Sequence, residues 1–235
     1  MWEALGWGAL AASSLVMGAI LGVARRWHQG WIGAVLGFGA GALISSISFE
    51  LAEEGFAKGG ALPLAIGLAT GALAFYLADR VVNRLGSRLG AGSAGLSLAL
   101  GALLDGVPEQ AVLGLGLAEG QGISIALLVA IFVSNLPESI GSSTDMRTAG
   151  ERSRRIIGLW AVVAIACTLA TLGGYVIGRV TAERCEAAVD GFAAGALLVM
   201  LVGSMIPEAT EKAHDKAGLA AVLGFAVAAG LSALS

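Results

Sequence analysis

Long apolar runs, separated by short polar segments, occupy almost the whole chain. A helix needs about 20 apolar residues to cross the hydrocarbon core of a bilayer. Runs of that length predict eight transmembrane helices, near 4–24, 30–51, 60–79, 94–117, 121–143, 156–178, 187–206 and 217–234. The connecting segments are short and leave no room for a soluble domain. We therefore expect an all-α integral membrane protein with a single transmembrane domain over residues 1–235.

Composition agrees with this interpretation. Hydrophobic residues make up 57% of the chain, charged residues 13%, and the mean hydropathy is +0.83. Soluble domains carry about 25% charged residues. The net charge of −3 gives no basic surface for nucleic acid, so the lipid bilayer is the expected partner. The two cysteines, Cys167 and Cys185, lack any CxxC spacing and are interpreted as packing residues.

Basic residues are concentrated in alternate connections between the predicted helices. The connections after the first, third, fifth and seventh helices hold Arg25, Arg26, Arg80, Arg84, Arg88, Arg147, Arg152, Arg154, Arg155, Lys212 and Lys216. The opposite set holds Lys58, Arg179 and Arg184. Because basic loops stay in the cytoplasm, this asymmetry predicts that both termini are extracytoplasmic. We expect a multi-pass protein of the plasma (inner) membrane.

Part of the sequence is repeated. Gly37-Phe-Gly-Ala-Gly-Ala-Leu43 in the second predicted helix resembles Gly191-Phe-Ala-Ala-Gly-Ala-Leu197 in the seventh, and the same register aligns Glu54 with Glu208. The two helices run in opposite directions under the predicted topology. This pattern predicts an inverted repeat in a 3+2+3 plan, over residues 4–79, 94–143 and 156–234, as in many secondary transporters.

Two Pro-Glu motifs lie inside the fourth and fifth predicted helices. They are Asp105-Gly-Val-Pro-Glu109 and Ser134-Asn135-Leu-Pro-Glu138. A charged side chain at the bilayer centre costs roughly 3 kcal/mol, so acids at this depth indicate a functional site. Residues four apart share one helix face, which gives each helix a pair of oxygen ligands. A more ordinary interpretation is that the prolines kink the helices and the polar side chains hold them together.

Facing helices would combine these side chains into an all-oxygen pocket. No Lys or Arg lies in the middle of any predicted helix. The negative charge must therefore be balanced by a bound cation or by protons. A divalent metal that exchanges against protons satisfies both conditions.

Further acids lie near the ends of the repeated helices. Glu50 and Glu54 end the second helix, and Glu208 follows Pro207 at the end of the seventh. They could guide a cation toward and away from the central pocket, or they could simply be solvated helix ends. Glu208 is the stronger candidate because its Pro-Glu pair repeats the central pattern.

These motifs resemble the ZIP (Zrt/Irt-like) family of divalent metal transporters. The fourth helix of that family carries His-Asn-x-Pro-Glu-Gly and the fifth carries x-x-x-Pro-Glu. Matching positions in this chain are Pro108, Glu109, Asn135, Pro137 and Glu138. The resemblance implies eight helices in the family's 3+2+3 bundle and metal ligands on helices four and five. Glu50-Leu-Ala-Glu-Glu54 and Ile206-Pro-Glu-Ala209 are also similar to the family's flanking segments.

The chain departs from the family pattern at several ligand positions. Asp105 stands where the family has His, Gly106 where it has Asn and Gln110 where it has Gly, while Ser134 holds a position often taken by His or Gln. Losing imidazole favours hard cations such as Mn, Mg or Ca. The family resemblance keeps Zn, Cd, Fe and Mn as expected substrates.

The leading hypothesis is transport of a divalent metal cation into the cytoplasm. The metal is the substrate, and no resident cofactor is expected; a homodimer is left open. The alternative is a proton- or sodium-coupled carrier of a non-metal solute, against which the aromatic content of 6% argues. An intramembrane enzyme is not supported, because no His lies within a predicted helix to pair with a serine and no second intramembrane Asp accompanies Asp105.

Overall fold

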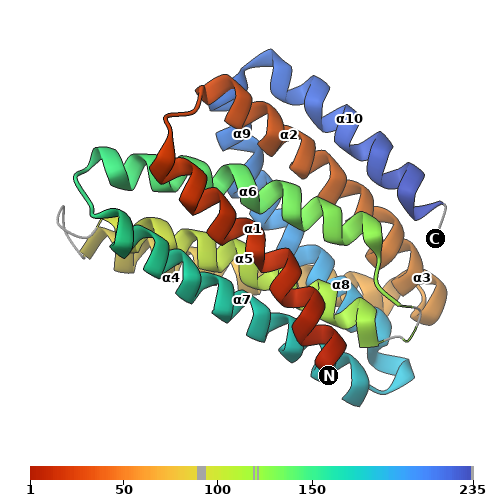
Figure 1. The fold of residues 1–235 in the computed structure, drawn as a ribbon. Coiled ribbons are helices and arrows are strands. Elements are labelled where there is room, and N and C mark those ends of the chain that lie inside the picture. The colour runs from red at the N-terminus through yellow and green to blue at the C-terminus, as the bar shows by residue number, and fades with distance from the viewer. Residues whose placement is uncertain (89–93, 119, 121, 234–235) are drawn as a thin grey trace.

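The computed structural model describes the chain except residues 89–93, 119, 121 and 234–235, and the described residues form helices and short connections without strands. The helices are α1 (Trp2–Ala24), α2 (Gln29–Ser46), η1 (Ile47–Glu53), α3 (Glu54–Gly59), α4 (Ala61–Arg88), α5 (Ala94–Ala118), α6 (Ile125–Thr148), α7 (Ser153–Val180), α8 (Glu183–Met200), η3 (Leu201–Met205), α9 (Ile206–Ala213) and α10 (Asp215–Ser232). They run roughly along one direction in a bundle, and α1 begins at the end of the bundle where α10 finishes (Figure 1).

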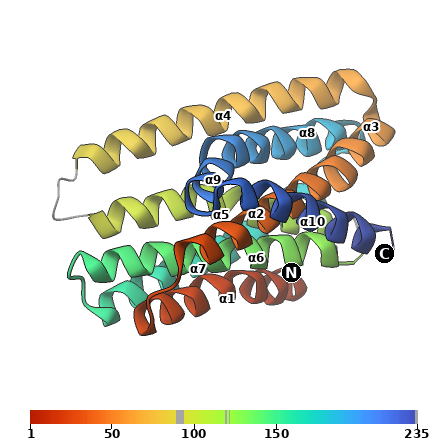
Figure 2. The same ribbon diagram turned by 90° about the horizontal axis from the view of Figure 1, so that it is seen from above.

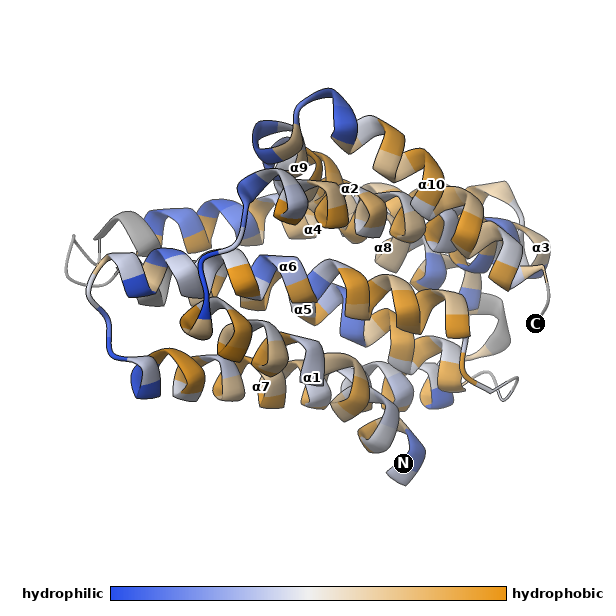
Figure 3. Cartoon of the chain, turned by 45° about the horizontal axis from the view of Figure 1, so that its top comes forward, coloured by the Kyte–Doolittle hydropathy of each residue, from blue (hydrophilic) through white to orange (hydrophobic). Residues whose placement is uncertain are grey.

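Seven helices of the described part are long and apolar enough to cross a membrane. They span Trp2–Ala24, Gln29–Gly59, Ala61–Leu85, Ile125–Thr148, Ser153–Val180, Cys185–Ala213 and Asp215–Ser232. The outer helices also expose large apolar side chains, including Leu62 on α4, Val162 on α7 and Leu219 on α10. Figure 3 shows that hydrophobic positions predominate along the helices, with hydrophilic positions on α9, at the start of α10, at several other helix ends and in parts of α6. The chain is therefore a multi-pass membrane protein.

The helices pack in four close pairs. Helix α2 lies along α10, α8 along α4, α1 along α6, and α5 along α7. Figure 2 shows α4 and α8 side by side on one flank of the bundle, with α1 and α7 on the other and α5 between them. This arrangement places the two helices that carry the central Pro-Glu motifs inside the bundle.

Glycines allow these pairs to approach backbone to backbone. A Cβ added at Gly41 of α2 would overlap the carbonyl oxygen of Ala221 on α10, and one added at Gly195 of α8 would overlap that of Leu68 on α4. Close approach through small residues replaces the hydrophobic effect as a source of helix association in lipid. The glycine-rich repeat seen in the sequence thus forms two of the four tight contacts.

Adjacent glycines on α7 give a matched test of this packing. A Cβ at Gly174 would overlap the carbonyl oxygen of Ala111 on α5, whereas a Cβ at Gly173 has no neighbour within 4 Å. We expect Gly174→Ala to destabilise the purified protein by about 1–3 kcal/mol, because overpacking forces the two backbones apart. Gly173→Ala should leave the melting temperature in detergent unchanged or slightly raised. Equal melting temperatures for the two variants would contradict the close α5–α7 contact.

Helices extend further than the apolar runs predict. Helix α4 continues to Arg88 rather than ending near residue 79, and α8, η3 and α9 form one continuous helix to Ala213 rather than ending near residue 206. Hydropathy reports the length buried in lipid, but helical hydrogen bonds persist into the solvated interface. Lys212, which the sequence placed in a connection, therefore lies on a helix.

Two π-helical segments interrupt the helices that carry the repeated glycine motif. Segment η1 follows α2 and segment η3 follows α8, and each leads directly into a short α-helix, α3 or α9. Such segments are uncommon and often occur at functional sites. Here they bring Glu50 and Ser204 into the bundle.

Candidate functional site

The central acids lie in the middle of the bundle, where α5 and α6 face each other. Glu109 is 1% exposed and Ser134 is fully buried. Ser134 Oγ donates toward the Glu109 carboxylate over 3.3 and 3.5 Å, and the same hydroxyl also lies 3.0 Å from the carbonyl oxygen of Ile131. Hydroxyl hydrogen bonds are usually about 2.7–2.8 Å long. Glu109 is therefore a buried carboxylate that receives a weak, shared hydrogen bond from Ser134 and lies beside the amide of Asn135.

Asn135, next to Ser134 on α6, is buried, and its amide oxygen has no hydrogen-bond partner among the described residues. The residue is 1% exposed, and its amide group acts on the Glu109 carboxylate without a hydrogen bond of good geometry. Most buried polar groups are paired, and an unpaired amide costs free energy. The Asn135 oxygen is available to a ligand at the level of Glu109.

Asp105 is held by a residue from another part of the chain. Ser204 Oγ, on the π-helical segment η3, donates to Asp105 Oδ2 at 2.8 Å. This bond ties η3 to α5 in the centre of the bundle. Ser204 was not a candidate in the sequence analysis.

Glu138 and Glu208 complete the central acidic group. Glu208 lies in the first turn of α9 and forms an ion pair with Lys212 one turn later. The charges of Asp105, Glu208, Glu109 and Lys212 all act on Glu138. The acids of α5, α6 and α9 therefore share one electrostatic environment, together with one ammonium group.

The ligands are near one another but do not form a finished metal site. Among the described residues, no group of three His, Cys, Asp or Glu side chains is close enough to hold an ion. Carboxylate, amide and hydroxyl oxygens are nevertheless the ligands that hard divalent cations prefer. Binding would require the α5, α6 and η3 side chains to close on the ion.

Packing leaves little space for a side chain at Gly106, where the ZIP motif has Asn. A Cβ at Gly106 would stand 2.8 Å from Cys167 Sγ, which is buried on α7. An Asn at this position, as in the ZIP motif, would displace the thiol. Gly106 offers no side-chain ligand, and α7 fills the adjacent space.

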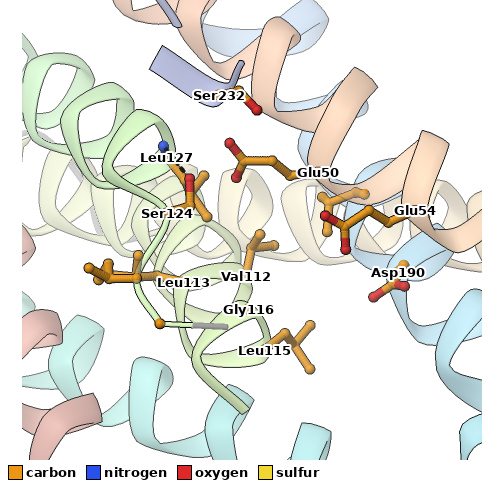
Figure 4. Close-up of a pocket in the computed structure, with 13 residues that line it drawn as sticks. Glu50, Glu54, Val112, Leu113, Leu115, Gly116, Ser124, Leu127, Asp190 and Ser232 are labelled. Atoms are coloured by element: carbon orange, nitrogen blue, oxygen red, sulfur yellow. Dashed lines mark hydrogen bonds between the residues drawn. The ribbon is translucent and has the colours of Figure 1, made fainter. Parts of the chain in front are cut away.

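A separate cavity opens between α5, α6, α8 and the α2–η1–α3 helix. Its volume is about 240 Å³, and its walls include Glu50, Glu54 and Asp190 together with Ser124 and Ser232. Figure 4 shows the three carboxylates directed into this cavity from two different helices. Lys58 bridges two of them, at 3.4 Å from Glu54 and 3.7 Å from Asp190. The cavity has a mixed polar and apolar lining, with three carboxylates and one lysine paired to two of them, and lies toward the end of the bundle where the termini are.

The predicted site residues therefore divide into two sets. Asp105, Glu109, Ser134, Asn135, Glu138 and Glu208 lie in or beside the central group, whereas Glu50 and Glu54 line the separate cavity. Apolar side chains of Val112, Leu113 and Leu127 form part of the cavity wall and are buried in the core. Because Val112 and Leu113 follow Glu109 by one turn of α5, these residues separate the cavity from the central acids.

Comparison with known proteins adds no family assignment. No protein-family model matches the chain, and no curated protein is similar to it in sequence. The fold and the buried acids define a multi-pass helical membrane protein with an intramembrane carboxylate site. The ZIP resemblance rests on the motif residues alone.

Proposed function

We propose that the protein transports divalent metal cations, of the Zn, Cd, Fe and Mn group, into the cytoplasm. The observation that carries the proposal is Glu109, a carboxylate buried at the centre of a membrane protein, whose neighbours Ser134 and Asn135 are both uncharged. Buried charges are stable only when they are paired, protonated or bound to metal. A divalent cation bound by Asp105, Glu109, Asn135 and Glu138 would supply that charge from the substrate itself.

The architecture proposed for this function is a ZIP-like 3+2+3 inverted repeat in which α5 forms the eighth crossing. Helix α5 has 25 residues, about 37 Å of helix, and packs along α7. The close pairs support the repeat. Under the repeat, the pair α2–α10 in one half is equivalent to the pair α8–α4, and the pair α1–α6 is equivalent to the pair α7–α5. The π-helical segments η1 and η3 also stand at equivalent positions in the two copies.

Unequal surroundings of repeated residues support alternating access. Glu208 lies beside the central acids, whereas Glu54, its counterpart in the repeat, lines the separate cavity. In inverted-repeat transporters the two repeats adopt different conformations. The repeats swap these conformations when the protein changes from open on one side of the membrane to open on the other. The cavity is then the extracytoplasmic vestibule, and the layer formed by Val112, Leu113 and Leu127 is the barrier that must open.

The native cysteines test the proposed orientation. Cys185 is exposed near the start of α8, whereas Cys167 is buried. In intact cells, a membrane-impermeant maleimide should label the wild-type protein at Cys185, because that end of the bundle is placed outside by the positive-inside rule. A Cys185→Ser, Ala149→Cys variant should be labelled only after permeabilisation, since Ala149 lies exposed in the basic connection between α6 and α7. The opposite labelling pattern would contradict the proposed topology.

Direct binding tests the metal assignment. Equilibrium dialysis of the purified protein against Mn, Zn, Cd and Fe should show saturable binding that is lost in Glu109→Gln. If the protein binds none of these ions, and instead takes up an organic solute in response to a proton or sodium gradient, the non-metal carrier replaces the metal transporter as the function. In that case the buried acids would carry the coupling proton or sodium ion.

A further inference from the structure

Lys212 extends into the bundle from the last turn of α9. Its side chain is 18% exposed and forms an ion pair with Glu208. A basic residue at a helix end ordinarily directs its ammonium group outward to water. Lys212 instead directs it inward along the wall of the acidic site.

Two glycines make the space for this side chain. A Cβ at Gly33 on α2 would stand 2.7 Å from Lys212 Cβ, and a Cβ at Gly141 on α6 would stand 3.0 Å from Lys212 Nζ. The side chain thus crosses from α9 past α2 to the surface of α6. Gly141 follows Glu138 by one helical turn and shares its face, so the ammonium group lies close to the central acids.

The charges around Lys212 favour exchange between partners. Its ammonium group is paired with Glu208, and its charge also acts on Glu138. An ammonium group carries three donors on a flexible stem and can move between nearby carboxylates without a fixed geometry. Both of these carboxylates belong to the group proposed to bind the metal.

The sequence contains a counterpart of this pair in the other half of the repeat. The register that aligns Gly37 with Gly191 aligns Glu54 with Glu208 and also Lys58 with Lys212. Both are ion pairs one helical turn apart, and Lys58 lies beside the carboxylates of the separate cavity. The cavity and α9 therefore each have a lysine paired with an acid.

We propose that Lys212 is a tethered cation that closes the inner end of the metal site. In the metal-free protein its single positive charge offsets part of the negative charge of Glu208 and Glu138. An arriving divalent cation repels the ammonium group and takes over the carboxylates, and Lys212 returns to them when the metal leaves toward the cytoplasm. This inference rests on the proposed metal transport and adds a residue that competes with the substrate and speeds its release.

The variant Lys212→Met tests this role, because Met keeps an unbranched stem in the slot while the charge is removed. We expect equilibrium dialysis with the ion that the wild type binds most tightly to give a dissociation constant lower by about ten-fold, since a repelling charge and a competing ligand are both lost. Maximal flux in proteoliposomes should fall in the same variant. A residue with a merely structural role would lower flux without tightening binding.

Three further proteins make the test decisive. Lys212→Arg keeps the charge and should bind metal more like the wild type, and Lys216→Met, at an exposed lysine on α10, should match the wild type. If Lys212→Met does not fold, Lys212→Gln provides a second variant, because it also removes the ammonium charge and should tighten binding in the same direction. If the wild type binds metal but the folded Lys212→Met variant binds it with unchanged or weaker affinity, the inference is overturned and the proposed function is not. A wild type that binds no divalent cation overturns the proposed function and this inference together.

Discussion

Replacing Glu109 by Gln is expected to abolish saturable metal flux in proteoliposomes. The change keeps the shape of a side chain that is 1% exposed, and the Gln oxygen can still accept from Ser134. It removes one negative charge and one carboxylate ligand. Loss of groups that merely orient metal ligands costs about 10–100-fold, so loss of a direct ligand should reduce flux by about 100-fold or more.

Two controls separate this effect from damage to the fold. Glu3→Gln, at an exposed acid on the first turn of α1, should transport like the wild type. Ser134→Ala removes the weak donor but no ligand charge, and should lower flux less than Glu109→Gln does. Wild-type flux and an unchanged KM in a folded Glu109→Gln protein would show that the ion does not use this carboxylate.

Replacing Asp105 by His is expected to change which metal is transported. The present site offers only oxygen ligands, which favour hard cations such as Mn. An imidazole at Asp105, where the ZIP family has His, adds a nitrogen ligand that suits zinc. Maximal flux divided by KM should be measured for Zn and for Mn. We expect the ratio of the Zn value to the Mn value to rise by roughly ten-fold.

The corresponding control is Asp105→Asn. It retains an oxygen that can accept from Ser204 but removes the charge, so flux should fall for every ion without a change in the Zn to Mn ratio. If Asp105→His and Asp105→Asn lower flux equally and leave the ratio unchanged, Asp105 is not a ligand and acts only by holding η3 to α5.

The sequence was sufficient to predict the membrane class, the apolar helices and the central acids. Each of these depends on local composition: an apolar run of helical length, or a carboxylate such as Glu138 inside it. The interactions between segments distant in the sequence could not be predicted. Ser204 and Asp105 are joined by a single hydrogen bond between η3 and α5, and the separation of these residues along the chain leaves no local signal.

Lys212 was misplaced for a different reason. Hydropathy ends the seventh apolar run near residue 206, so the lysine falls into a predicted connection, whereas the helix continues through η3 and α9 to Ala213. A basic residue with a long stem can then reach back toward the acids through the space left by Gly33 and Gly141. The prediction that no basic side chain lies in the middle of a predicted helix is correct for Cα positions, but the Lys212 ammonium group reaches the wall of the site.

Glu50 and Glu54 illustrate the limit of reasoning from a repeat. Sequence register pairs Glu54 with Glu208, but the two residues have different surroundings, because the two halves of the bundle are packed differently in this structure. Sequence similarity identifies equivalent positions and not the conformation each half adopts. The division into a cavity and a central group therefore required the structure.

Flux of divalent cations into liposomes that contain the purified wild-type protein tests the central claim most directly. With a panel of Zn, Cd, Mn, Fe, Mg and Ca, we predict saturable uptake of at least one of Zn, Cd, Mn and Fe, absent from empty liposomes and from liposomes with Glu109→Gln. Uptake of none of these ions by folded, reconstituted protein would contradict a carboxylate-based metal transporter.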